Sequence, residues 1–497
     1  MIAHFFGAGY VADAFRGAFR IPNMLNNLFG EGVLSASFIT VYARVRALGK
    51  EKEAQELAGI VFGTLALVCS VLVTAGILLA PALTDIIVPG FTGRQRALTI
   101  QIIRILFPGT GFLVLGAWCL GVLNSHRSFL LPYVAPVAAN LIMVTALFAL
   151  GNGASQEQLV LKLAWAFVVG SAFQFLVQLP KTLRFLPGFR PSLNLGSTHA
   201  RTVIRNFGPI FLSRGVVQVS AYIDQMIASW LPLGSVAHLG YGQVISMLPI
   251  SLFSMSVSAA ELPTLSSATG TAEEVAATLR KRLLSGLRRI AFFTIPSAAA
   301  FLLLGDVIAS AIYQSGRFTH RDAVYVWAVL AGSAVGLLAS SLGRLYSSGF
   351  YALLDSRTPL RFALVRIALT TGLGFLFALE LPRWLGIDPR LGVAGLTASA
   401  GVAGWVEFAL LRRALNQRIG RTGIPIEFIV KLWPSALLSG ALAYFAKPFF
   451  APGHPRIQAA LVLPLFGLLY FGFTRTLGVA ESREVTGAVL RRLRLGR

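Results

Sequence analysis

A stretch near the N-terminus, DAFRGAFRIPNMLNNLFGEG at residues 13–32, gathers polar side chains in a very apolar chain. Only 13% of the 497 residues are charged, whereas 55% are hydrophobic. The polar positions recur every three or four residues, so a helix would place them along one stripe. These positions are Asp13, Arg16, Arg20, Asn23, Asn27 and Glu31, and Asn26 lies beside them. Such a set of guanidinium, carboxylate and amide groups predicts a binding surface for a polar ligand.

Further ionisable residues fall inside apolar segments, where they are costly unless they face a cavity or a partner. Arg214 and Asp224 are ten residues apart in one apolar segment, too far to pair within a helix, and Arg344 lies in another. Arginines that face a common cleft would bind an anion such as pyrophosphate through forked hydrogen bonds. Two other readings stay open for the first stripe: Asp13 and Arg16 could neutralise each other, and Arg16 and Arg20 could reach the membrane interface.

The elements that must position these residues are membrane-spanning helices. Apolar runs of about twenty residues, long enough to cross a hydrocarbon core of about 30 Å, recur along the chain. They predict an all-α, polytopic membrane protein with thirteen spans. The predicted spans are 13–42, 55–83, 98–123, 130–151, 159–180, 203–231, 236–262, 285–304, 323–350, 361–381, 391–411, 427–446 and 457–474.

The basic residues are distributed unevenly between alternate loops. Six loops and the C-terminal tail hold well over half of the 43 Lys and Arg residues, and the intervening loops hold few. The positive-inside rule therefore predicts that the basic loops and the C-terminus are cytoplasmic. Because the first span then begins at the outer face after only a short apolar segment, we expect a further helix to precede this sequence.

Several function classes are disfavoured. The net charge of +23 is spread over alternate loops and forms no basic patch with interleaved aromatic residues, so we expect no nucleic-acid partner. Cys69 and Cys119 lie in apolar runs without a CxxC or Cys/His grouping, which is typical of buried small hydrophobic residues. The predicted outer loops are short and contain few acids, so we expect no enzyme.

The longer polar segments suggest how the spans are grouped. Residues 181–202 form a polar connector near the middle of the predicted spans. We expect two pseudo-symmetric helical lobes around a central cavity, an N-terminal lobe at 1–180 and a second lobe at 203–411. Residues 412–497 would add a C-terminal helix pair and a basic cytoplasmic tail.

Four sequence blocks resemble the MurJ/MviN family of lipid II flippases, which belongs to the multidrug/oligosaccharidyl-lipid/polysaccharide exporter superfamily. The first, GAGYVADAFRGAFRIPNMLNNLFGEGVLSASFITVYA from Gly7, is similar to the family pattern G-x-G-x-x-x-D-A-F-x-x-A-F-x-x-P-N followed by F-x-E-G. The others are 233–265, YQSGRFTHRDA from Tyr313 and SSGFYALLDSRTP from Ser347. The blocks cover most of the chain in the family's order.

The resemblance implies a fourteen-helix inner-membrane protein that moves lipid II, the undecaprenyl-pyrophosphate-linked peptidoglycan precursor, outward by alternating access. By position, Asp13 matches a functionally important acid, Arg20 a basic position and Asn23 the Asn of the P-N motif. Arg344 matches a basic position before the GFY block. Asp224 lies where some members contribute a carboxylate to a sodium site. The expected coupling is to Na⁺, H⁺ or the membrane potential, with no other cofactor, and cell-wall synthesis proteins are expected partners.

The sequence departs from the family pattern at positions that matter for the substrate. Asn26 stands where the family has a cavity arginine, and Val244 stands where a second arginine is expected. Arg16 and Arg214 are not family positions, and we hypothesise that they replace the missing cations. The alternatives are a transporter of another polyprenyl-linked glycan or of a small compound, and a non-transporting scaffold in envelope synthesis.

Overall fold

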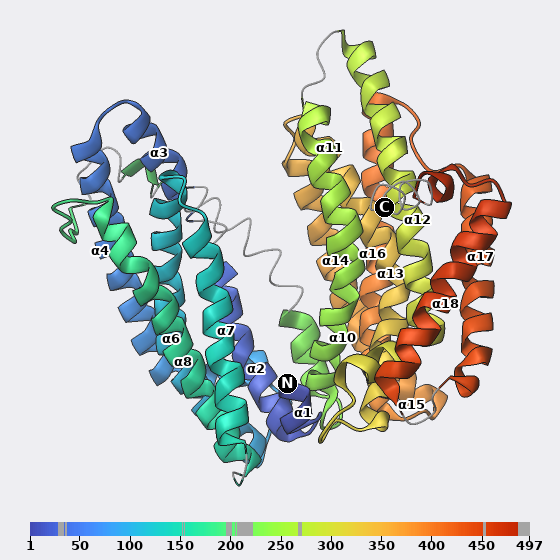
Figure 1. Cartoon of the computed structure of the whole chain (residues 1–497), viewed down its shortest axis with the longest axis horizontal. Coiled ribbons are helices and arrows are strands. Elements are labelled where there is room, and N and C mark those ends of the chain that lie inside the picture. The colour runs from blue at the N-terminus through green and yellow to red at the C-terminus, as the bar shows by residue number, and fades with distance from the viewer. Residues whose placement is uncertain are drawn as a thin grey trace, which may run out of the picture. The chain divides into compact units, whose positions relative to one another are not determined.

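The structure is a computed structural model of the whole chain. It describes residues 1–27, 34, 37–151, 153, 155–194, 201–203, 205, 222–266, 271–450 and 454–485. The chain forms two compact units, Met1–Val236 and Ala237–Arg497 (Figure 1).

The first unit is a bundle of helices. Its helices are α1 (Ile2–Phe6), α2 (Tyr10–Leu25), α3 (Thr40–Ala47), α4 (Glu51–Leu78), α5 (Ala80–Ile87), α6 (Gly93–Ser125), α7 (Leu130–Leu150) and α8 (Gln156–Arg184). Residues 222–229 are also helical. The predicted connector at 181–202 overlaps the end of α8, and the backbone N–H of Ser192 donates to the carbonyl oxygen of Gly59 on α4 at 3.2 Å. The lobe boundaries stay a prediction.

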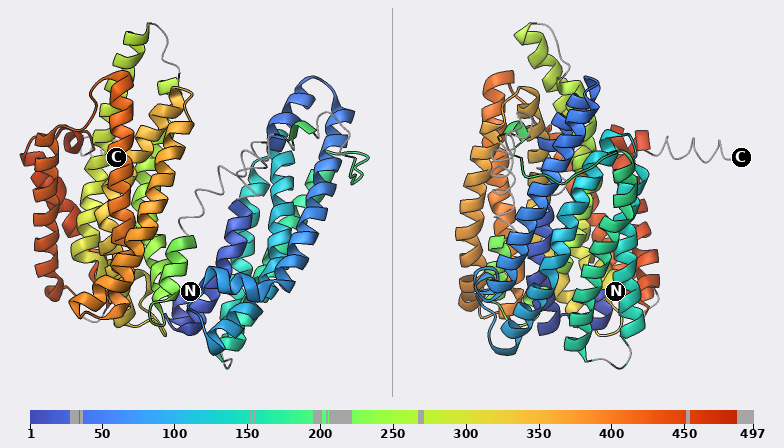
Figure 2. Two further views of the ribbon diagram at one scale, coloured as in Figure 1. Left: turned by 180° about the vertical axis from the view of Figure 1, so that it is seen from behind. Right: turned by 90° about the vertical axis from the view of Figure 1, so that its left-hand side faces the viewer.

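The second unit is also helical. Its elements are α10 (Ser235–Pro249), which begins just before the unit boundary, η2 (Ile250–Met255), α11 (Ser256–Ser266), α12 (Ala272–Tyr313), α13 (His320–Ala352), α14 (Arg357–Phe375), η3 (Leu376–Glu380), α15 (Leu381–Leu385), η4 (Pro389–Leu391), α16 (Gly392–Ile419), α17 (Ile426–Ala446), η5 (Lys447–Phe449) and α18 (Pro455–Thr476). The long helices run nearly side by side within each unit, as the turned views also show (Figure 2).

The predicted fold class, an all-helical multi-pass membrane protein, is confirmed. Within the described ranges, 11 helices are long and apolar enough to cross a membrane. The two other predicted spans, 13–42 and 203–231, include residues outside those ranges, so the count of thirteen stays a prediction. Of the first of them, the structure describes α2 and α3 and the residues next to them.

Three of the long helices begin with a capping box that is visible in the sequence. Ser155, Thr271 and Thr319 each accept a hydrogen bond at 3.3 Å from the backbone N–H three residues later, and that residue's side chain returns a bond. Because the first N–H groups of a helix lack partners inside the helix, these caps define where α8, α12 and α13 start.

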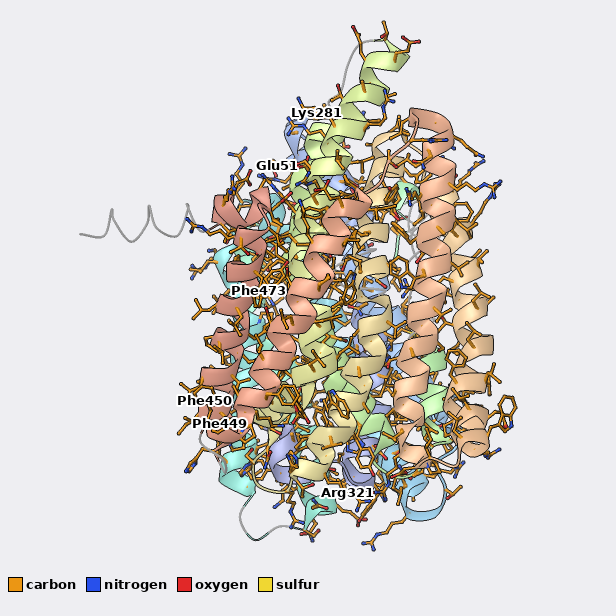
Figure 3. All side chains as sticks on the ribbon, turned by 90° about the vertical axis from the view of Figure 1, so that its right-hand side faces the viewer. Glu51, Lys281, Arg321, Phe449, Phe450 and Phe473 are labelled. Atoms are coloured by element: carbon orange, nitrogen blue, oxygen red, sulfur yellow. The ribbon has the colours of Figure 1, made fainter. Side chains whose placement is uncertain are left out.

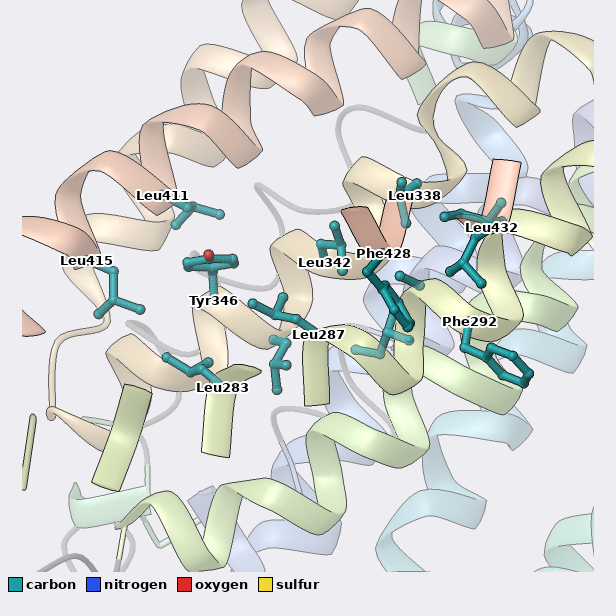
Figure 4. Packing of buried hydrophobic residues seen from close by; sticks show 14 of the residues in the cluster. Leu283, Leu287, Phe292, Leu338, Leu342, Tyr346, Leu411, Leu415, Phe428 and Leu432 are labelled. Carbon is teal, nitrogen blue, oxygen red and sulfur yellow. The ribbon is translucent and has the colours of Figure 1, made fainter. Parts of the chain in front are cut away.

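Each unit has its own hydrophobic core. In the first, Trp118 is fully buried, and its indole N–H donates to the Ala58 carbonyl oxygen at 3.1 Å. In the second, Leu287, Leu342, Tyr346 and Leu432 belong to a cluster that joins α12, α13, α16 and α17 (Figure 4). A buried side chain of this size contributes about 1.5–3 kcal/mol relative to an exposed one.

The small-residue run LGVAGLTASAGVAG, from Leu391, lets α16 approach α13 closely. A β-carbon at Gly336 of α13 would collide with the Cα of Gly401, so glycine is required at this crossing. Thr397 adds a hydrogen bond from its hydroxyl to the Val329 carbonyl oxygen at 3.0 Å. Small residues at a helix crossing are typical of membrane bundles, in which close van der Waals contact drives association.

The residues Lys281, Arg321, Phe449 and Phe450 mark the two ends of the second unit (Figure 3). Lys281 lies at one end, and Arg321, Phe449 and Phe450 lie at the other (Figure 3). These ends correspond to the predicted cytoplasmic and outer sides, respectively.

Candidate functional site

Helix α2 positions the predicted polar stripe. It runs from Tyr10 to Leu25 and places Asp13 in its first turn, where the positive end of the helix dipole favours a carboxylate. Apolar neighbours such as Phe15 and Ala18 are fully buried, so packing fixes the rotation of the helix. The stripe is therefore held in one orientation within the first unit.

Among the members of the stripe that the structure describes, Asp13 is the most buried, with 2% of its surface exposed. Its Oδ2 accepts a hydrogen bond from the backbone N–H of Gly234 at 2.6 Å. A second, longer bond of 3.4 Å comes from the side-chain amide of Gln95 on α6. The carboxylate thus joins α2, α6 and the turn before α10, and it gives the buried Gly234 N–H a charged acceptor.

A pocket of about 510 Å³ opens beside Asp13. Its lining residues are Tyr10, Asp13, Gly90, Phe91, Thr92, Arg94, Gln95, Ala228, Ser229, Leu231, Pro232 and Leu233. At its edge the Tyr10 hydroxyl donates to Glu157 Oε1 at 2.7 Å, and Arg94 Nη2 donates to Glu157 Oε2 at 2.8 Å. These polar contacts link α2, the start of α6 and α8 at the end of the unit that is predicted to face outward.

Arg20 contacts the helical segment 222–229. Its guanidinium carbon lies 5.5 Å from the centre of the Tyr222 ring, a distance at which the ring attracts a cation. The Tyr222 hydroxyl donates to the Arg20 carbonyl oxygen at 3.2 Å, and the Gln225 amide donates to the Gly17 carbonyl oxygen at 3.3 Å. Asp224, half-buried, lies within electrostatic reach of Arg20. These contacts fasten segment 222–229 to the polar stripe of α2.

The other predicted members of the stripe differ in exposure. Arg16 and Asn26 are half-buried, and Asn23 is exposed. All three lie on α2 or at its C-terminal end. Arg214 and Glu31 lie outside the described residues.

The second unit holds a separate group of charges within its spans. Arg366 Nη1 on α14 lies 3.2 Å from Glu407 Oε2 on α16. Arg344 on α13 is exposed and lies within electrostatic reach of both. Two cations and one anion leave this group with an excess positive charge, as binding an anion would require.

Comparison with known proteins decides the family. The family model described as "Lipid II flippase MurJ" matches residues 2–460. A curated protein of that name from Burkholderia cenocepacia is 32% identical, over 96% of this chain and 93% of its own length. The chain belongs to the lipid II flippase MurJ family.

Further relatives of the MurJ family agree. A probable lipid II flippase MurJ from Rhizobium tropici is 29% identical over 94% of this chain and 87% of its own length. A solved structure titled as MurJ in an inward closed conformation has a TM-score of 0.78 at 22% identity, covering 96% of this chain and 95% of that one. A multidrug resistance MATE family transporter of the MOP superfamily has a TM-score of 0.67 at 18% identity and covers 84% of this chain. At these identities the two structures show the shared fold.

The MurJ resemblance implied a sodium site at Asp224, and the surroundings of Asp224 give it no support. Among the described residues no group of three or more His, Cys, Asp or Glu could hold a metal ion. Arg20 already supplies a positive charge near Asp224. A sodium ion needs several oxygen ligands. The Asp224 site stays a prediction.

Sequence reasoning missed several residues at these sites. Tyr222, Gln225 and Gln95 contact the stripe, but an isolated uncharged polar residue in an apolar run carries no signal of its partner. Glu407 was missed although a signal existed, since it is a single acid inside the predicted span 391–411. Its partner is Arg366 of α14.

Proposed function

We propose that this protein is a flippase that carries lipid II across the bacterial cytoplasmic membrane. The main support for this proposal is the position of the charged stripe of Asp13, Arg16 and Arg20. Helix α2 holds this stripe in one orientation inside a membrane-spanning bundle of the MurJ family. Curated relatives that match nearly the whole chain bear that name. The protein acts as a transporter and not as an enzyme.

The stripe supplies the chemistry that a pyrophosphate head group needs. Arg16 and Arg20 offer guanidinium donors, and Asn23 and Asn26 offer amides for the sugar and peptide parts of the ligand. Arg344 and Arg214 would contribute further positive charge from the second lobe. Because a pyrophosphate requires charge in the cavity more than charge at one fixed point, these groups offset the arginines replaced by Asn26 and Val244.

The contacts of Asp13 suggest how access alternates. The Asp13–Gly234 and Arg20–Tyr222 contacts lie within the first unit, Met1–Val236, and they hold the segment that leads into α10 against α2. In the proposed cycle, this segment moves away from α2 when the cavity opens toward the outer face and returns when it closes. Moving one elementary charge through 100 mV is worth about 2.3 kcal/mol, so the membrane potential could bias this cycle without a bound cation.

The proposed orientation places the basic loops and the C-terminal tail in the cytoplasm. The released lipid II would then reach the outer face, where enzymes that polymerise peptidoglycan consume it. Cell-wall synthesis proteins are therefore proposed as partners.

Rescue of a bacterium depleted of its own lipid II flippase tests the proposal. The wild-type chain should restore growth and outward transport of lipid II. Arg20→Gln should lose most of this activity because it removes a cation from the stripe. Lys52→Gln, an exposed charge loss at the start of α4, is the matched control and should rescue like the wild type.

Protein level in the membrane must be measured in every strain. Absence of rescue by a wild-type chain that is present in the membrane would contradict lipid II transport and would favour another polyprenyl-linked glycan. If Arg20→Gln restores growth as well as the wild type does, Arg20 is not part of the head-group site.

A further inference from the structure

A second pocket lies on the last turns of α16, apart from the charges inside the spans. Its volume is about 530 Å³. The lining residues are Trp405, Phe408, Ala409, Arg412, Arg413, Asn416, Gln417 and Arg421. Positions 405, 409, 412 and 416 recur at steps of three or four, so one face of α16 carries an apolar half and then a basic half.

The basic half has no acidic counterpart. Three acids on neighbouring segments are already paired: Asp355 with Arg418 at 2.6 Å, Glu407 with Arg366 at 3.2 Å and Glu427 with Lys431 at 2.5 Å. In the part of the chain that the structure describes, Arg412, Arg413 and Arg421 form no ion pair.

A backbone contact holds Arg412 close to the pocket. Arg412 uses its Nε–H to donate to the Thr422 carbonyl oxygen at 3.0 Å, which leaves its terminal N–H groups for a ligand. The guanidinium of Arg280, from α12, lies beside Gly420 but does not line the pocket. Three pocket arginines therefore carry an uncompensated charge at one place.

The depth of the two halves matches the layers of a lipid. Twenty residues separate Gly392 from Arg412, and at 1.5 Å per residue they span about 30 Å, the thickness of the hydrocarbon core. Arg412 thus lies at the head-group level when Gly392 lies at the other interface, and Trp405 lies about 10 Å deeper. The indole of Trp405 is fixed by a 2.8 Å hydrogen bond to the Val335 carbonyl oxygen and is 39% exposed.

We propose that this pocket binds an anionic phospholipid of the surrounding bilayer. The head-group phosphate lies against Arg412, Arg413 and Arg421, and one acyl chain lies along Trp405 and Phe408. A basic pocket at the end of a membrane helix is a recognised way to hold an anionic lipid. A free phosphate or an acidic peptide would use the arginines and would leave the apolar half without a function.

The bound lipid has a structural consequence for the second unit. Helix α16 packs against both α13 and α14, and the Tyr346 ring on α13 contacts the Phe408 ring edge-on with centroids 5.5 Å apart. A ligand that binds only the folded state stabilises it by mass action. Anionic lipid should therefore raise the thermal stability of the full-length protein.

Lipid binding to the purified full-length protein tests the site. Native mass spectrometry with phosphatidylglycerol and phosphatidylethanolamine should show a preference of at least about tenfold for the anionic lipid. The variant Arg412→Gln/Arg413→Gln/Arg421→Gln should lose most of this preference. Lys281→Gln/Arg282→Gln/Arg289→Gln removes the same charge from exposed positions of α12 and should keep it. Equal losses in both variants would mean a general charge effect and would overturn the proposal.

The apolar half of the pocket has its own test, which does not depend on the arginine variants. Phosphatidylglycerol with brominated acyl chains should quench tryptophan fluorescence more than brominated phosphatidylethanolamine, and Trp405→Phe should remove the difference. An unchanged difference in Trp405→Phe would place the lipid elsewhere. Complete displacement of the lipid by millimolar inorganic phosphate or by an acidic peptide would identify a soluble anion or a protein segment as the occupant and would also overturn the proposal.

Discussion

At the scale of single residues, Asp13 illustrates how a charge inside an apolar bundle can serve structure and function together. Its carboxylate is 2% exposed and accepts the Gly234 N–H at 2.6 Å. A buried charge with a donor from a distant turn is a strong contact, and removing the acceptor leaves a buried N–H without a partner. The negative charge itself is a separate property, so substitutions that keep the acceptor can divide the two roles.

Asp13→Ala should destabilise the protein by about 1–3 kcal/mol, because it leaves the Gly234 N–H unsatisfied. Asp13→Asn keeps an acceptor oxygen, so its stability should lie closer to that of the wild type. Thermal unfolding of the purified protein measures both effects. If Asp13→Asn folds well but fails in the rescue assay, the charge itself is required for transport. Equal stability of Asp13→Ala and the wild type would contradict the structural role.

At the scale of elements, close helix crossings and local caps determine how the second unit packs. Gly336 meets Gly401 where α13 crosses α16, and there is no space there for a β-carbon. The start of α14 depends on Asp355, which accepts hydrogen bonds from the backbone N–H groups of Arg357 and Thr358 at 3.0 Å. Both features act through geometry that a single substitution can change.

Gly336→Ala should lower stability by about 1–3 kcal/mol, because the added methyl group pushes α13 away from α16. Gly372→Ala on α14 is the matched control, since no heavy atom lies within 4 Å of its β-carbon position. That change should be neutral or should stabilise by about 0.5–1 kcal/mol, as expected for alanine in a helix interior. Thermal unfolding of the two variants should thus move in different directions. Similar shifts would exclude the crossing as the cause.

The cap on α14 should make stability depend on pH. Hydrogen bonds from the Thr358 hydroxyl and backbone N–H, together with Arg418, hold the pKa of the Asp355 carboxyl well below its usual range. Because the folded pKa is depressed, the stabilisation is present above the unfolded value of about 3.9 and is lost as pH falls through the folded pKa. The difference in unfolding temperature between the wild type and Asp355→Asn should stay constant from pH 7 to about pH 5 and shrink below about pH 4. A difference independent of pH down to pH 3 would contradict this account.

At the scale of the whole molecule, the asymmetric distribution of Lys and Arg between alternate loops determines the predicted orientation. The hydrophobic helices can cross a membrane in either direction, and the basic loops decide between the two. The proposed direction of transport depends on this orientation. It can be measured without knowledge of the substrate.

A green fluorescent protein fused after Arg497 should be fluorescent, because the C-terminus is predicted to be cytoplasmic. Alkaline phosphatase fused after Gly151, in a predicted outer loop, should be active, whereas the same enzyme fused after Leu48 should be inactive. The opposite pattern at all three positions would reverse the orientation and with it the proposed side of release.

The sequence by itself determined the fold class and much of the local structure. Runs of apolar residues longer than a bilayer is thick allow only membrane-spanning helices, because backbone groups in lipid must satisfy one another within the helix. Features that depend on residues only a few positions apart could also be predicted from the sequence. They are the capping boxes at Ser155, Thr271 and Thr319 and the charged stripe that begins at Asp13. The motif blocks indicated the MurJ family, which the comparisons confirmed.

Only the tertiary structure decided which partners these residues meet. Asp13 and its hydrogen-bond donor Gly234 are 221 positions apart in the sequence. The guanidinium of Arg20 packs against the ring of Tyr222, and Arg366 forms an ion pair with Glu407 from another helix. Such contacts depend on how each helix is rotated and shifted along its neighbours. That arrangement results from the packing of many apolar side chains and from close crossings such as Gly336 with Gly401, and no short stretch of sequence carries it.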